Sequence, residues 1–246
     1  MNAMERMRRL HGYAVVTMDD HVGRLQTTYV DDRRWNIRHL VVARGHWLPL
    51  SEVLVAPKDV SAVERAHRRL HLSLSTHELA GRPEAWTDRP VSQQRRVGVD
   101  DIYWYAVFPA FARRSVGDGM ISTRRDDRHL RSSRELLGYY VHARDDEIGH
   151  VADFLVDERL WLIRYAVVDT RNWWPGKKVL LPMDWVTWVS WGAAALYVNL
   201  SRSVIGNAPE YDPHRPLNGD DEKLLIEYYG RPKEPATAVR WIGRAS

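Results

Sequence analysis

The chain has 246 residues, a formal net charge of +4 and no cysteine. This length suits one large domain or two of the common size, each able to bury a core without a metal or a disulfide. The absence of cysteine excludes disulfides, thiolate metal sites and cysteine nucleophiles, and it is compatible with a reducing cytoplasm, where we expect the protein to be located.

The first residues, MNAMERMRRLHGY, carry charges that no apolar stretch follows, so they do not resemble a secretory signal peptide. The most apolar run is residues 185–198, and it is shorter than the roughly 20 residues that a membrane-spanning helix needs. We therefore predict no membrane span.

A repeat organises the predicted elements. Residues 31–44 read DDRRWNIRHLVVAR and residues 157–170 read DERLWLIRYAVVDT, so both have an acidic start, a Trp, an Ile-Arg pair and a Val-Val pair. A shift of 126 residues (157 − 31 = 126) aligns them, and the same shift aligns residues 83–84 with 209–210 without a gap. An internal duplication explains this better than chance, and two copies of this length indicate two similar domains, not a solenoid.

Each copy is predicted to consist of short strands. From Trp161 the sequence alternates with a period of two and is rich in β-branched and aromatic residues, as is typical of a strand. Residues 138–157 predict two strands around an acidic turn at 145–146, and residues 177–185 and 194–201 supply two more. The predicted fold class is mainly β, with two small, partly open antiparallel β-barrels.

Short helices are predicted at the ends of the copies. Residues 75–81 and 201–207 can each form a short helix in which the first serine is the N-cap. Near the end of the second copy, Asp220 or Asp221 can cap a further helix with an apolar side. Each barrel is therefore expected to carry helical additions.

The limits of the repeat divide the chain. The predicted units are a first domain at 1–108, an Arg-rich linker at 109–133, a second domain at 134–232 and a tail at 233–246. Between Arg113 and Arg134, seven Arg against three Asp give 7 − 3 = +4, which equals the net charge of the whole chain. We favour a solvated linker between independently folding domains over a nucleic-acid site, and expect any RNA binding to be weak and lost as salt rises.

The sequence shows no recognised arrangement of catalytic groups. Its eleven histidines have no HExxH spacing for zinc, no Gly-rich phosphate loop is present, and the paired aspartates of both copies are explained as turn residues. We predict a non-enzymatic protein with no catalytic residue, metal or cofactor. Arg38 and Arg164 occupy the same place in both copies, and pairing with a carboxylate such as Asp31 or Asp157 is favoured over a catalytic or phosphate-binding role.

The main candidate site is a run of tryptophans: Trp185, Trp188 and Trp191. Because they are spaced by three, they are predicted to line one side of a short helical or 3₁₀ turn. The 126-residue shift places smaller or charged residues opposite them, namely Asp59, Ala62 and Arg65. Large aromatics are favoured at buried contacts between proteins, so the tryptophans are the candidate interface, either between the two barrels or between two chains. The alternative is that they only cap the core of their own barrel.

The second copy resembles the PRC-barrel domains, which occur in the cytoplasmic part of the photosynthetic reaction-centre H subunit and in the C-terminal half of a ribosome-maturation factor. The resemblance is carried by residues 138–170, by VLLP at 179–182, by the stretch 196–216 and by EYYGRP at 227–232. The resemblance covers residues 12–90 and 138–232 approximately, and the chain looks like the bacterial proteins that carry this domain twice. The first copy departs from the family pattern in its acidic turn and in its tail, GRPEAWTD.

The resemblance implies a partly open antiparallel barrel that serves as a docking or assembly module, without catalytic residues. The predicted partner is another protein or a second copy of this chain. One alternative is a soluble regulator of a membrane redox complex, similar to the reaction-centre H subunit. The other is an RNA-processing or ribosome-assembly factor, which the Arg-rich linker would serve.

Overall fold

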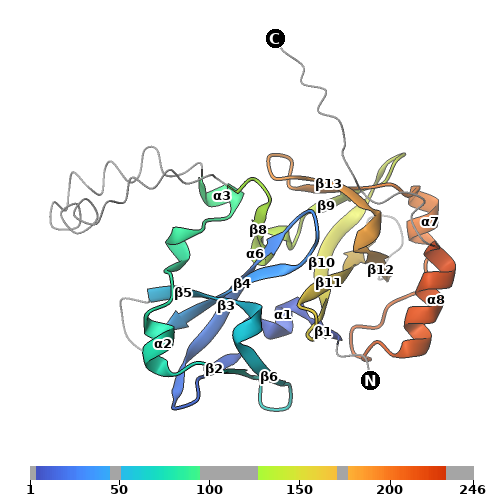
Figure 1. Cartoon of the computed structure of the whole chain (residues 1–246). Coiled ribbons are helices and arrows are strands. Elements are labelled where there is room, and N and C mark those ends of the chain that lie inside the picture. The colour runs from blue at the N-terminus through green and yellow to red at the C-terminus, as the bar shows by residue number, and fades with distance from the viewer. Residues whose placement is uncertain (1–3, 45–50, 95–126, 171–176, 231–246) are drawn as a thin grey trace, which may run out of the picture.

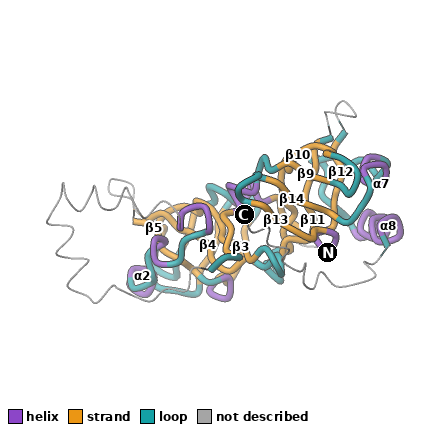
Figure 2. Tube along the Cα trace, turned by 90° about the horizontal axis from the view of Figure 1, so that it is seen from above, coloured by secondary structure: helices purple, strands orange, loops and turns teal. Residues whose placement is uncertain are grey.

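The computed structural model describes residues 4–44, 51–94, 127–170 and 177–230. Its strands form two sheets that lie side by side (Figures 1 and 2). Each sheet curves into a partly open β-barrel, so the predicted mainly β fold class is confirmed.

The first sheet has the strand order β5-β4-β3-β2-β7-β6, with β8 added to β3. Its strands are β2 (Ala14–Val16), β3 (His21–Asp31), β4 (Ile37–Arg44), β5 (Ser51–Val55), β6 (Val60–Glu64), β7 (Arg69–Leu72) and β8 (Leu130–Ser132). Short helices accompany it: η1 (Pro57–Asp59), α2 (Thr76–Ala80), η2 (Ala85–Thr87) and α3 (Val91–Gln94).

The second sheet has the order β12-β11-β10-β9-β14-β13, with β1 added to β10. Its strands are β1 (Met4–Arg6), β9 (Tyr140–His142), β10 (Glu147–Asp157), β11 (Leu162–Asp169), β12 (Lys178–Pro182), β13 (Val186–Ser190) and β14 (Ala195–Val198). Its helices are η4 (Met183–Trp185), α7 (Arg202–Gly206) and α8 (Gly219–Tyr229), of which α7 and α8 lie on the side away from the first sheet (Figure 1). Among the helices of the described ranges, none is long and apolar enough to cross a membrane.

The two sheets share one architecture. Their strand orders correspond one to one, and in each sheet a single pair is parallel, β2 with β7 and β9 with β14, while the other pairs are antiparallel. The acidic turns also have the same role: Asp19 accepts a hydrogen bond from the backbone N–H of Thr76, and Asp145 from that of Arg202, each at the start of a short helix. The structure therefore shows the two-fold correspondence, and its origin in a duplication stays a prediction.

The acidic start of the repeated motif forms a tight turn. Asp31 Oδ1 accepts hydrogen bonds from the backbone N–H groups two and three residues later, and Asp157 Oδ1 does the same in the second half. Each turn ends at a tryptophan with positive φ, 58° at Trp35 and 50° at Trp161. This conformation costs a non-glycine residue about 1–2 kcal/mol. The strand predicted from Trp161 therefore begins one residue later, at Leu162.

These two tryptophans lie where the halves of the molecule meet. Ile37 N donates a hydrogen bond to Trp161 O, and Ile163 N donates one to Trp35 O, both at 2.8 Å. Both tryptophan side chains are buried, and the ring of Trp35 lies 6.4 Å from that of Phe154 in the other half. The reciprocal bonds and the burial hold the strained turns in place.

The leading segment of each half is added to the sheet of the other half. Strand β1, at the start of the chain, pairs with β10, whereas β8, at the start of the second half, pairs with β3. The two segments are related by the repeat (130 − 4 = 126), so the exchange is reciprocal. Helices α1 (Met7–Leu10) and α6 (Ser133–Leu136) follow these strands, and their apolar side chains enter one continuous core with residues of both halves.

The two exchanged strands, β8 and β1, have different charged residues beside them. On one side Arg131 pairs directly with Asp32. On the other, the shift places Glu5 at the position of Arg131 (131 − 126 = 5) and Glu158 at that of Asp32 (158 − 126 = 32). The two acids share Arg65, whose Nη2 lies 2.7 Å from Glu158 and whose Nε lies 3.7 Å from Glu5. Burial raises the pKa of the Glu158 carboxyl, and Arg65 partly offsets this effect.

The predicted division of the chain into domains stays a prediction. The exchange of β1 and β8 leads us to expect that the two halves bind each other. If a specific protease site is inserted after Gly117 and cut, we expect the two pieces to elute together on native size exclusion and to separate in denaturant. The same experiment with Leu130→Asp, which places a charge at a fully buried position of β8, should weaken the association. Separation of the unsubstituted pieces in native buffer would contradict a cohesive exchange.

Arg65→Gln removes the cation between two acids with largely buried side chains, so we expect a loss of about 1–3 kcal/mol in the free energy of unfolding at neutral pH. Without Arg65, the pKa of Glu158 rises further. The folded state then binds protons more readily than the unfolded state, and the deficit shrinks as the pH falls from 7 towards 5. Denaturant melts at several pH values measure this, with Arg69→Gln, half-exposed at 52%, as control. A deficit that grows on acidification would refute it.

Candidate functional site

The structure separates the three tryptophans of the predicted site. Trp185 closes η4, Trp188 lies within β13, and Trp191 follows in a turn, so the prediction that they share one side of a helical turn is wrong. The reason is a bulge: the register of β13 shifts between Val186 and Trp188, which leaves Val186 and Val189 both buried although they are three residues apart. The spacing of three between the tryptophans therefore reflects an irregular strand and not a helical turn.

The tryptophans have different surroundings. Trp188 is 43% exposed, whereas Trp185 is half-buried and packs against the core, and Trp191 is half-buried. Trp188 therefore faces the outer surface of the second sheet, and Trp185 belongs to its inner side. Their predicted role in an interface stays a prediction.

Trp188 starts a row of aromatic side chains across the outer face. It is the cross-strand partner of Tyr197 on β14, Tyr197 is that of His142 on β9, and His142 is that of Glu147 on β10. Cross-strand partners share one face of a sheet. The rings of His142 and Tyr197 are stacked, with centroids 5.1 Å apart. We call these four residues the aromatic row; it runs over four strands and ends in a carboxylate.

The neighbouring row extends this face. Tyr140, two residues before His142, is 49% exposed and is the cross-strand partner of half-buried His150. The face therefore presents adjoining aromatic rings, an arrangement that is uncommon on a surface without a partner.

The first half lacks this surface although its strands have the same register. The residues at the corresponding positions are Ala62, His71 and Val16 (188, 197 and 142, each minus 126), and they are partners in the same way. Glu147 corresponds to His21 (147 − 126 = 21). The aromatic row is therefore a property of the second half and not a requirement of the barrel.

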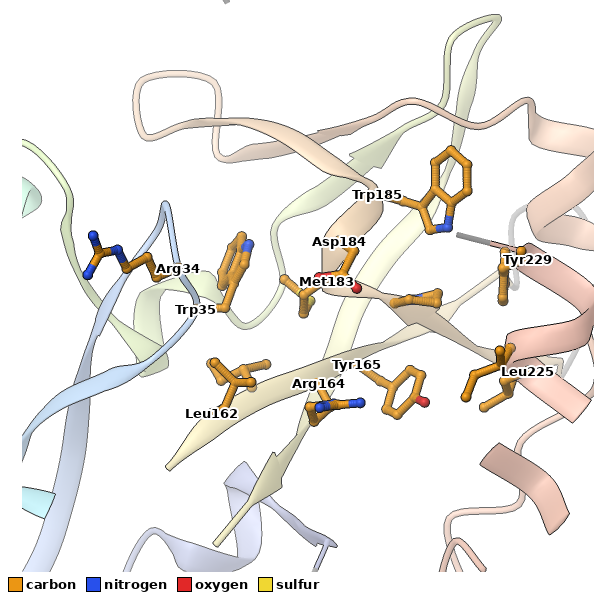
Figure 3. A pocket seen from close by; sticks show the side chains of 14 residues that line it. Arg34, Trp35, Leu162, Arg164, Tyr165, Met183, Asp184, Trp185, Leu225 and Tyr229 are labelled. Atoms are coloured by element: carbon orange, nitrogen blue, oxygen red, sulfur yellow. The ribbon is translucent and has the colours of Figure 1, made fainter. Parts of the chain in front are cut away.

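A pocket of about 270 Å³ lies at the inner side, where Trp185 is found (Figure 3). It is walled by β11, η4 and α8 of the second half and by the turn of Trp35 from the first. Figure 3 shows the guanidinium of Arg34 directed away from the other labelled side chains, whereas Arg164 lies beside Tyr165. The pocket thus depends on both halves of the molecule.

Two polar atoms of the pocket residues have no hydrogen-bond partner in the described part of the chain: Trp185 Nε1 and Tyr229 Oη. Burial raises the pKa of Tyr229, so its hydroxyl stays protonated at neutral pH and can donate. The indole N–H can only donate. Each buried, unpaired group costs about 1–3 kcal/mol.

The pocket also holds Arg164, whose counterpart Arg38 has a different environment. Arg38 pairs with Asp127 and lies 3.9 Å from Asp31, as the sequence predicted. Arg164 lies beside Tyr165 but forms no ion pair with a carboxylate of the described residues. The predicted pairing with Asp157 is therefore not formed.

Two other charges bear on the pocket. Burial raises the pKa of the Glu222 carboxyl, and the nearby charge of Arg164 partly offsets this. Asp184, at the rim, is exposed. Among the described residues no three His, Asp or Glu side chains are grouped so as to hold a metal ion. The prediction of no metal and no cofactor stays a prediction.

The comparison with known families agrees with this architecture. Residues 129–205 match the model of the PRC-barrel domain family. The chain therefore contains a PRC-barrel domain in its second half, which confirms the resemblance predicted there. The match includes Trp185, Trp188 and Tyr197 and ends before α8. No curated protein matches the chain.

The sequence prediction missed several residues of these two sites, namely Tyr197, His142, Glu147 and Tyr229. Tyr197 could have been found by treating 186–198 as a hairpin, since its pairing places Tyr197 opposite Trp188. The two strands predicted around the acidic turn at 145–146 could have paired His142 with Glu147. Tyr229 had no such signal, because its burial depends on where α8 packs.

We expect Trp188→Ala to lower the free energy of unfolding by about 1 kcal/mol or less, because the side chain is exposed and the core lies behind it. Leu196→Ala, at a fully buried position of the adjacent strand, should cost about 2–5 kcal/mol. Urea melts of the full chain compare the two. A Trp188→Ala loss as large as that of Leu196→Ala would show that Trp188 supports the core of its own barrel.

Proposed function

We propose that this chain is a non-enzymatic docking module and that the aromatic row is the surface that binds a protein partner. The observation that carries the proposal is the line of Trp188, Tyr197 and His142, in which Trp188 is exposed and the other two are half-buried. This line is present on the PRC-barrel half and replaced on the other half. Tryptophan and tyrosine are enriched among the residues that contribute most to binding free energy.

The chemistry of the row indicates the kind of partner. Its aromatic faces attract apolar side chains and cations, and the row ends at Glu147, whose carboxylate forms no hydrogen bond or ion pair within the described residues. A partner segment with an apolar side chain next to an Arg or Lys would match both features. This favours a protein partner over RNA, whose phosphates Glu147 would repel.

The sheet supplies a rigid support for such a contact. Strands β14 and β9 lie inside the sheet, and Thr187 Oγ1 donates a hydrogen bond to Tyr197 O across the bulge. The backbone that carries these rings is therefore held in place before binding, which reduces the entropy cost of association.

The test is a comparison of capture by the full chain and by three variants. Proteins retained by the unsubstituted chain should be lost with Trp188→Ala and Glu147→Gln, and kept with His71→Ala, the counterpart of Tyr197 in the first half. For a purified partner found in this way, Trp188→Ala should raise the Kd about tenfold or more.

Three results would count against the proposal. One is an unchanged affinity of the partner for Trp188→Ala. Another is tight RNA binding at moderate salt, which would favour the ribosome-assembly alternative. The third is a self-association, seen by sedimentation, that Trp188→Ala abolishes; it would replace the separate partner with a second copy of this chain.

A further inference from the structure

We infer that the pocket at Trp185 binds a small organic carboxylate with an apolar ring and a second oxygen atom. The first half provides an internal comparison. There, at the same position of the fold, the guanidinium of Arg38 is paired with the Asp127 carboxylate, which comes from a distant part of the chain. In the second half, Arg164 forms no ion pair with a carboxylate of the residues that the structure describes.

The position of the missing carboxylate is accessible to a ligand. Arg164 is exposed, it lies among the pocket residues, and the groups near it are Tyr165 and the more distant charge of Glu222. An Arg can bind a carboxylate through two parallel N–H groups, and such charge-assisted bonds are stronger than neutral ones. The ligand carboxylate would take the place that Asp127 has in the first half.

The residues that line the pocket indicate that the main part of the ligand is apolar. Much of the pocket surface is apolar and is formed by Trp35, Leu162, Met183, Leu225 and Ile226. A volume of about 270 Å³ is at the small end for ligand sites. A single ring with a short side chain therefore fits better than a nucleotide or a fatty acid.

The second oxygen follows from the unpaired donors. Trp185 and Tyr229 both line the pocket, and neither Trp185 Nε1 nor Tyr229 Oη has a hydrogen-bond partner among the described residues. Figure 3 shows the indole nitrogen of Trp185 at the edge of its ring that is nearer to Tyr229. An oxygen of the ligand would remove the cost of these unpaired groups, which is a gain that an apolar ligand cannot provide.

This site is separate from the aromatic row, so the two inferences can fail independently. Trp185 contributes to the pocket and Trp188 to the outer face. Ligand binding by the Trp188→Ala variant should therefore be unchanged.

The experiment uses the full chain and three probes: 3-(4-hydroxyphenyl)propionate, 3-phenylpropionate and the neutral 3-phenylpropionamide. Calorimetry measures affinity, and the indole N–H signal of Trp185, assigned from Trp185→Phe, reports the location by NMR. We expect both acids to bind saturably, the hydroxy acid more tightly than the plain acid, and the amide about tenfold or more weakly.

Two variants and a matched control identify the contacts. Arg164→Gln should weaken acid binding about tenfold or more, whereas Arg38→Gln, at the same position of the first half, should leave it unchanged. Tyr229→Phe should lower the affinity for the hydroxy acid while keeping or raising the melting temperature, because it deletes an unpaired buried hydroxyl. A residue with only a structural role would show the opposite pattern.

The inference is overturned if neither acid binds saturably, or if the amide binds as well as the acids. It is equally overturned if Arg164→Gln leaves the affinity unchanged, or if Arg38→Gln weakens binding as much as Arg164→Gln. Thermal melts of each variant, recorded first, show whether a loss of ligand affinity is caused by a loss of folding.

Discussion

The reciprocal exchange of leading strands is the constraint on which the rest of this structure depends. Strand β1 completes the second sheet and β8 completes the first, so neither sheet has all its strands from one contiguous half. The helices that follow carry Met7, Leu10 and Leu136 into a core shared by both halves. The turn of Trp35, which meets the second half through reciprocal backbone hydrogen bonds, supplies one wall of the pocket.

Within this common frame the two halves use equivalent positions differently. In the first half the charged groups form ion pairs inside the chain: Arg38 pairs with Asp127, and Asp59, the counterpart of Trp185, pairs with Arg82, although the buried Oδ2 of Asp59 has no hydrogen bond of good geometry. In the second half the same positions hold Arg164 and Trp185, and within the described ranges the first has no paired carboxylate and the N–H of the second has no acceptor. The backbone hydrogen bonds of the two sheets are similar, so the two halves differ mainly in the side chains that they leave available for binding.

The sequence predicted what depends on local pattern and on the repeat. The alternation after Trp161 and the acidic turns identified the strands, and the shift of 126 residues identified their correspondence. The exchange was not predictable, because MER and LRS are three-residue strands with no periodicity of their own. The tryptophans were assigned to a helical turn because a bulge changes the period of β13 locally. The pocket depends on where α8 packs, and no local pattern encodes that.

The exchange also explains how a barrel with an exposed aromatic face can be stable. A large core shared by both halves supplies the free energy of folding, so the outer face of β9, β14 and β13 need not contribute to it. Residues there can change from Ala62 to Trp188 or from His71 to Tyr197 without loss of the fold, as the two halves show. Because exposed apolar area is not used in folding, its burial remains available to a partner. The fold thus separates the residues that stabilise the molecule from those that bind.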